Sequence, residues 1–179
     1  MYKHCFVIIL ICAEHLATAG VPMQNFYWRD YLHGEVPFDA LEAAPGVYIG
    51  QFGFDNGPFV VSIYPHRNSA IAMHFLYTKV TENIKIFCTP EPKNFYWQTV
   101  DFAQGGVGQM KNAVRGGYHQ PNWILYIGRA MHLKNWKVGK VYDIEELDGP
   151  GMYVWGPNNT KVVLQKFDLL KYNATGIAR

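Results

Sequence analysis

Few residues of this sequence combine the type and the spacing that catalysis requires. The only serines are Ser62 and Ser69, and neither lies in the G-x-S-x-G pattern that exposes a nucleophilic serine on a sharp turn. Cys88 ends the alternating segment 84–88, on the same face as two isoleucines, which predicts a buried thiol without an adjacent base. We therefore predict that the protein is not an enzyme.

Patterns for metal or nucleotide binding are also absent from the sequence. It contains no H-E-x-x-H, and metal-ligand spacing is missing among the histidines at positions 33, 66, 74, 119 and 132. The glycine-rich segment 105–108 follows no hydrophobic strand and opens no helix, as a phosphate-binding loop would. We predict no metal and no cofactor.

Composition favours a folded all-β protein. The chain has 179 residues, of which 49% are hydrophobic, a content that excludes disorder and suits one domain or two halves sharing a core. The aromatic content of 16%, with 17 glycines and 10 prolines, is typical of many short strands and tight turns. A net charge of +2 gives no reason to expect nucleic acid or an anionic membrane as a partner.

The first residues resemble a secretory signal peptide. Lys3 and His4 precede the apolar segment 5–13, and small residues follow at 17–19. A membrane anchor is the alternative, but roughly 9 apolar residues fall short of the ~20 that span a bilayer. We predict a cleaved signal over residues 1–19, a secreted protein and no membrane span.

Secretion changes the expected cysteine chemistry. Cys5 and Cys12 would leave with the signal, so Cys88 would stay as a single thiol without an internal disulfide. Two N-x-Thr sequons remain, and they make Asn158 and Asn173 candidates for glycosylation.

The chain contains a divergent internal duplication. Tyr48-Ile49-Gly50 recurs as Tyr126-Ile127-Gly128, and Ser62-Ile63-Tyr64 resembles Lys140-Val141-Tyr142. Both pairs are separated by 78 positions, and an offset held across a loop is unlike a chance match.

Other matched segments extend the duplication to both ends of the chain. Phe26-Tyr27-Trp28 recurs as Phe95-Tyr96-Trp97, and 39–42 resembles 112–115. The proline-rich segment 89–93 is the best linker between the copies. We predict a first repeat over 20–93 and a second over 94–179.

Alternating and β-branched segments predict the strands. Gly128 should interrupt one strand and Gly139 should form the bend before the next. The predicted strands are 59–64, 70–77, 84–88, 124–127, 140–142, 152–155 and 161–170.

The second copy resembles a DM9 repeat. The resemblance rests on three ordered motifs, Asn112–Gly117, Leu125–Ala130 and Val138–Val141, with Met152–Val154 and Phe167–Leu170 fitting its end. The first copy is similar at 34–41 and 48–51, so the resemblance covers nearly the whole mature chain. The chain looks like the secreted insect branch of DM9-domain proteins.

The resemblance implies two tandem antiparallel β repeats packed as one compact unit. Characterised relatives include mannose-binding lectins of invertebrate immunity, whose sugar pockets use an Asp after the Gly-Gly segment and the Lys of a Pro-Gly-Lys element. Lys140 matches that lysine, whereas the acidic position falls on His119. In the first copy, Ser62 replaces the lysine and 44–46 lacks the acid, so one pocket is altered and the other lost.

Each candidate ligand residue also has a simpler explanation. Lys140 would otherwise be a solvated lysine at a strand end, and His119 a surface loop residue. Arg129 would form a structural ion pair with Asp143 or Glu145. A stacking platform or plain core packing would account for three tryptophans, Trp123, Trp136 and Trp155.

We therefore expect a secreted, non-catalytic recognition protein that binds glycans or microbial surfaces through Lys140, His119, Trp123 and Arg129. A structural or partner-binding extracellular protein is the alternative, and an exposed aromatic patch would favour it. A carrier of a small apolar ligand is a third, and it requires a cavity of roughly 300 Å³ between the halves. A homodimer is also left open.

Overall fold

The computed structural model describes residues 25–67, 69–73, 77–120, 122–144 and 149–173. The predicted signal peptide lies outside these residues. Within the described part the chain is all-β, as predicted, with short 3₁₀ turns and without an α-helix. The described part likewise holds no helix long and apolar enough to cross a membrane.

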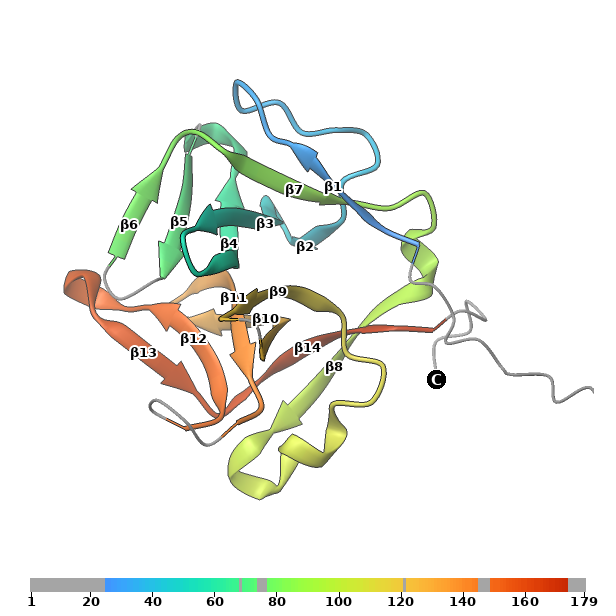
Figure 1. Ribbon diagram of the computed structural model, residues 1–179, viewed down its shortest axis with the longest axis vertical. Coiled ribbons are helices and arrows are strands. Elements are labelled where there is room, and N and C mark those ends of the chain that lie inside the picture. The colour runs from blue at the N-terminus through green and yellow to red at the C-terminus, as the bar shows by residue number, and fades with distance from the viewer. Residues whose placement is uncertain (1–24, 68, 74–76, 121, 145–148, 174–179) are drawn as a thin grey trace, which may run out of the picture.

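The first sheet contains the strands up to residue 88 (Figure 1). Its strands are β1 (Tyr27–Asp30), β2 (Glu42–Ala44), β3 (Val47–Phe54), β4 (Gly57–Tyr64), β5 (Ser69–Met73), β6 (Tyr77–Val80) and β7 (Ile84–Cys88). They are ordered β1-β7-β3-β4-β5-β6, with β2 paired to β3, and all pairs are antiparallel.

The second sheet begins at Phe95 and occupies the lower part of Figure 1. Its strands are β8 (Phe95–Asp101), β9 (Arg115–His119), β10 (Trp123–His132), β11 (Asn135–Tyr142), β12 (Gly151–Trp155), β13 (Lys161–Leu164) and β14 (Lys166–Tyr172). The 3₁₀ turns are η1 (Pro65–Arg67), η2 (Pro92–Asn94), η3 (Phe102–Gln104), η4 (Gly106–Gln109) and η5 (Pro157–Asn159).

The two sheets have the same strand order. The second reads β8-β14-β10-β11-β12-β13, with β9 paired to β10, so each strand has a counterpart seven places earlier. The register agrees as well, because Tyr48 pairs with Ile63 and Tyr126 pairs with Val141. The duplication inferred from short matches is therefore a duplication of the whole sheet.

The pairing outside the main ladders is also repeated. Ala40 forms an isolated bridge with Cys88, and Ala113 forms the equivalent bridge with Lys171. The next residue after each alanine donates its N–H to the opposite strand, at 3.0 Å in the first copy and 2.9 Å in the second. The lead-in to β2 and the lead-in to β9 thus follow the same path.

Two predicted strands are each divided in the structure. The predicted strand 70–77 becomes β5 and β6, and 161–170 becomes β13 and β14. β5 and β6 run antiparallel, whereas β13 and β14 run in the same sense and are separated by a bend at Gln165. Alternation of side chains reveals neither break, because it is a local pattern and does not report which strand each segment pairs with.

The expected interruption at Gly128 and bend at Gly139 are wrong. These glycines pair with each other inside β10 and β11, and the turn lies at Leu133 and Lys134, both with positive φ. A Cβ on Gly128 would lie 2.7 Å from Val141, and one on Gly139 would lie 2.4 Å from the carbonyl oxygen of Tyr153. Close packing, not turn geometry, explains both glycines.

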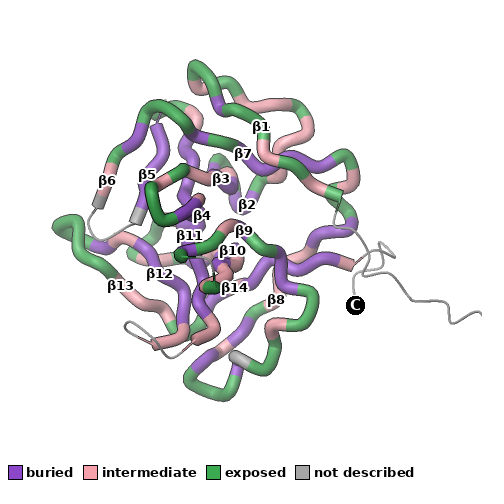
Figure 2. Tube along the Cα trace, in the orientation of Figure 1, coloured by how far each residue is buried: buried purple, intermediate pink, exposed green. Residues whose placement is uncertain are grey.

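Among the described residues, four apolar clusters hold the sheets together, and one of them joins Phe59 of the first copy to Leu125, Tyr142 and Tyr153 of the second. The shared core joins both copies and includes Ile49, Val60, Ile127 and Val138. A second cluster belongs mainly to the first copy and a third to the second, on the opposite face of each sheet. Figure 2 shows the buried segments running through the middle of the molecule, along β3, β4, β10 and β11.

Candidate functional site

Lys140 and His119 meet in one aromatic cluster, although 21 residues separate them. Lys140 lies on β11, and its Nζ is 4.3 Å from the ring centre of Phe59 and 5.4 Å from that of Tyr142. His119 ends β9, and its ring centre lies 5.1 Å from that of Phe59. The first copy thus supplies Phe59 to a cluster built mainly by the second.

Lys140 is a buried cation, so the simpler explanation of a solvated strand-end lysine is wrong. Only 4% of the residue is exposed, because Phe59 of the first copy and Tyr142 pack on its side chain. Burial, with a smaller contribution from Lys161, lowers the pKa of Lys140 to about 8. Its contacts with described residues are ring faces, and no carboxylate or carbonyl there accepts a hydrogen bond from Nζ.

For His119, likewise, the simpler explanation of a surface loop residue is wrong. It pairs with Trp123 across β9 and β10 and is 5% exposed. Nδ1 of His119 and the hydroxyl of Tyr142 share a hydrogen bond of 3.1 Å. Burial raises the pKa of Tyr142, so its hydroxyl stays protonated and is able to donate.

The three tryptophans do not form a single stacking platform. Trp123 packs its ring 5.3 Å from His119 and belongs to the cluster around Lys140. Trp136 and Trp155 pack against the shared core instead. Of the three, only Trp123 lies with the candidate site.

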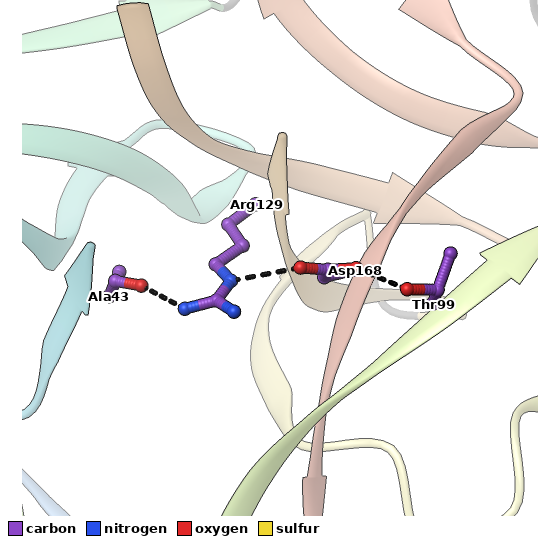
Figure 3. A network of polar contacts seen from close by, with 4 residues as sticks. All are labelled: Ala43, Thr99, Arg129 and Asp168. Atoms are coloured by element: carbon purple, nitrogen blue, oxygen red, sulfur yellow. Dashed lines mark hydrogen bonds and ion pairs between the residues drawn. The ribbon is translucent and has the colours of Figure 1, made fainter. Parts of the chain in front are cut away.

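Arg129 lies apart from this cluster, in the network drawn in Figure 3. Its Nε donates to Asp168 at 3.1 Å, and Asp168 also accepts from Thr99 at 2.7 Å. The expected structural ion pair therefore exists, but its predicted partners are wrong: β14 pairs with β10 in register at these two residues, and Asp143 does not take this role. Glu145 lies outside the described residues.

The guanidinium of Arg129 also joins the two copies. It donates to the carbonyl oxygen of Ala43 on β2 and lies 4.5 Å from the ring centre of Trp97 and 5.2 Å from that of Trp136. Two aromatic faces, a carboxylate and a carbonyl thus surround one cation.

Gln51 makes the matching contact in the opposite direction. It stands 78 residues before Arg129 in the equivalent register and donates its amide to the carbonyl oxygen of Gly116 at 2.8 Å. Gly116 is itself the counterpart of Ala43 in β2. Reciprocal contacts of this kind are the signature of a two-fold interface, here between two copies in one chain.

Two surface grooves border the contact between β9 and the first copy. The larger, called here the inter-repeat groove, has a volume of about 400 Å³ and is lined by Trp28, Gln51, Pro58, Arg115, Gly116, Gly117, Tyr118 and Ile124. The smaller, of about 370 Å³, lies along the β3–β4 turn and shares Pro58 and Tyr118 with it. The sequence singled out none of these residues as ligand contacts.

The remaining predicted site residues are placed as follows. Cys88 is fully buried, as predicted, and burial raises the pKa of its thiol to about 11. Asn158 is exposed in η5, and Asn173 is half-buried after β14. Among the described residues, no group of three or more His, Cys, Asp or Glu is arranged to hold a metal ion.

Sequence comparison identifies the family. The model of the DM9 repeat matches residues 42–147, which is more than half of the chain. The protein belongs to the DM9 repeat family. No curated protein matches it with significant similarity.

Membership in the DM9 family points to a role in recognition or binding. The matched segment runs from β2 into the residues after β11, so it includes Lys140, His119, Trp123 and Arg129. Phe59 and Tyr142 are part of the same DM9 segment and were missed by sequence reasoning. The offset of 78 residues pairs Tyr142 with the matched Tyr64 and could have drawn attention to it.

Proposed function

We propose that this DM9 protein is a secreted, non-catalytic recognition protein that binds carbohydrate through Lys140 and His119 in innate immunity. The observation that carries the proposal is the position of Lys140, which is only 4% exposed and whose Nζ contacts ring faces without a hydrogen bond to any described residue. Family membership supports a binding role.

The chemistry of this cluster suits a polyhydroxylated ligand. An ammonium carries three N–H donors, and at neutral pH a pKa of about 8 keeps Lys140 mostly protonated. Sugar hydroxyls would supply the missing acceptors, and the half-buried ring of Trp123 would cover a C–H face. His119, held by its hydrogen bond to the hydroxyl of Tyr142, would contact the ligand beside Lys140 and Trp123.

Mannan retention tests the proposal. We expect the wild-type protein to be retained on immobilised mannan and eluted by free mannose, whereas Lys140→Met should lose at least about tenfold in affinity, as expected for a lost charge-assisted hydrogen bond. His119→Asp, which restores the acid found in lectin relatives, should strengthen binding.

Lys137→Met is the matched control. Lys137 lies on the same strand, is equally buried and has a pKa lowered by burial to about 8, but it donates to the carbonyl oxygen of Trp155 at 2.6 Å. Loss of binding in Lys140→Met alone supports the proposal. Absence of retention in the wild type, or equal loss in both variants, would count against it.

A partner-binding role is the second candidate, and exposed apolar side chains favour it. Phe38 is 96% exposed, and Leu32 is 62% exposed on the same connection between β1 and β2. Contact with another protein or a second copy of the chain would cover these side chains. Sedimentation of wild type and Phe38→Ser would show a change in assembly state if the second copy is the partner.

A further inference from the structure

The two-fold relation between the copies gives the inter-repeat groove a counterpart elsewhere on the interface, and side chains fill that counterpart. Strand register places Trp97 where the groove has Trp28, Arg129 where it has Gln51, and Trp136 where it has Pro58. In the filled counterpart, Arg129 lies close to the rings of both tryptophans and donates a hydrogen bond to the carbonyl oxygen of Ala43. The filled counterpart therefore shows that a space of this kind accommodates a guanidinium between aromatic rings.

The inter-repeat groove lacks the side chains that fill its counterpart. Gln51 is shorter than Arg129 and is held by Gly116, and Pro58 has no large ring to match Trp136. A volume of about 400 Å³ stays open between Trp28, Tyr118 and Ile124. This volume falls within the range of small-ligand sites.

The charges around the two spaces are reversed. The filled counterpart of the groove has Glu42 on β2 and Asp168 on β14, and Asp168 neutralises Arg129. At the equivalent positions the inter-repeat groove has Arg115 and Lys85, of which Lys85 is paired with Asp30 at 2.6 Å. Arg115 forms no salt bridge with any described carboxylate and is the single charged residue in the groove lining.

We propose that the inter-repeat groove binds a carboxylate-bearing saccharide, with Arg115 on the carboxylate and the rings of Trp28 and Tyr118 against the sugar face. A guanidinium matches a carboxylate with two parallel hydrogen bonds. Aromatic rings cover the C–H face of a sugar, and Tyr118, 49% exposed, is accessible for this. The assignment of a sugar rests on the proposed recognition function, whereas the site and its charge preference are separate from Lys140.

The shared lining of the two grooves favours an oligosaccharide over a single sugar. Tyr118 and Pro58 line both grooves, so a ligand seated on Arg115 would continue past Tyr118 toward the β3–β4 turn. A trisaccharide of galacturonate is therefore a suitable probe. Its fully methyl-esterified form has the same skeleton without the charges and serves as the matched neutral ligand.

Calorimetric titration of the whole protein tests the proposal. We expect trigalacturonate to bind at least about tenfold more tightly than its methyl ester, and Arg115→Gln to remove that difference. Tyr118→Ala should weaken both ligands by severalfold. Lys93→Gln, which removes an exposed charge in η2 outside the groove, should bind as the wild type does.

A double variant that introduces the side chains of the filled counterpart provides an independent test. Gln51→Arg combined with Pro58→Trp should block the groove and abolish trigalacturonate binding, although it adds a positive charge. Tighter binding by this double variant, equal binding of acid and ester, or no effect of Arg115→Gln would each overturn the proposal.

The mannan experiment separates this proposal from the proposed function. Trigalacturonate binding that depends on Arg115 but not Lys140 supports the groove even if mannan is not retained. Mannan retention that depends on Lys140, together with no binding of trigalacturonate, would overturn the groove proposal alone.

Discussion

Equivalent residues of the two copies have diverged where their surroundings differ. Ser62 and Lys140 occupy the same register, and both are buried. The hydroxyl of Ser62 donates to the carbonyl oxygen of Val138 at 2.8 Å and accepts from its N–H at 2.9 Å, which ties β4 to β11. Lys140 has aromatic faces instead, so one position fastens the copies together and the other holds a charge in the cluster.

Burial of Lys140 predicts a pH-dependent stability. Its pKa of about 8 in the folded protein lies below the unfolded value of 10.5, so above pH 8 the unfolded chain binds more protons and stability rises with pH. For each lysine whose pKa is lowered to about 8, we expect the free energy of unfolding to increase by about 1 kcal/mol between pH 7 and 9. Urea titration at several pH values measures this.

The control for this prediction is Lys140→Met, which should reduce the increase without removing it, because burial also lowers the pKa values of Lys137 and Lys171. The window must end near pH 9, since the raised pKa values of Cys88 and Tyr142 oppose the trend at higher pH. A pH dependence unchanged in Lys140→Met would contradict the assignment.

At the scale of elements, β9 determines how the copies meet. Its two glycines press against the first copy: a Cβ on Gly116 would lie 2.3 Å from Val60, and one on Gly117 would lie 1.9 Å from the carbonyl oxygen of Pro58. The matching strand β2 carries Ala43 and Ala44 instead. The two faces of the interface are therefore unequal, which leaves one groove open and the other filled.

Gly117→Ala tests this close approach. The added methyl group cannot fit without moving β9 away from β4, so we expect a loss of about 2 kcal/mol or more in unfolding free energy, in the range of overpacked cores. Gly53→Ala is the control, because a Cβ at Gly53 meets no atom within 4 Å. Similar stability of the two variants would show that β9 is not packed as described.

At the scale of the molecule, neither copy buries its own apolar surface completely. The shared core takes Ile49 and Val60 from one sheet and Ile127 and Val138 from the other. Separation would expose these residues to water, at a cost of roughly 25 cal/mol for each Å² of apolar surface. The two repeats should therefore unfold in a single transition.

An isolated repeat should fail to fold. We expect residues 25–93, expressed alone, to show no cooperative thermal transition by circular dichroism, because half of the shared core would be missing. Mixing this fragment with residues 94–173 should restore β structure. Cooperative melting of the first fragment alone would refute the dependence.

Sequence predicted the larger features and missed those that depend on distant contacts. Short matches at a constant offset predicted the duplication, and alternation predicted Ile84–Cys88 with its buried thiol. The partner of Arg129 was missed because Asp168 lies 39 residues away on a strand that pairs only in the fold. A surface loop was the simpler explanation for His119 because Pro121 follows two positions later, and proline is rare inside strands.

The sequence by itself determined the all-β class and the repeat, because strand periodicity and duplicated motifs are local signals. Tertiary structure alone decided that Lys140 and His119 are buried together and that one inter-repeat groove is open while the other is filled. Those outcomes depend on which side chains face each other across two sheets, and that pairing is set by packing between residues far apart in the chain.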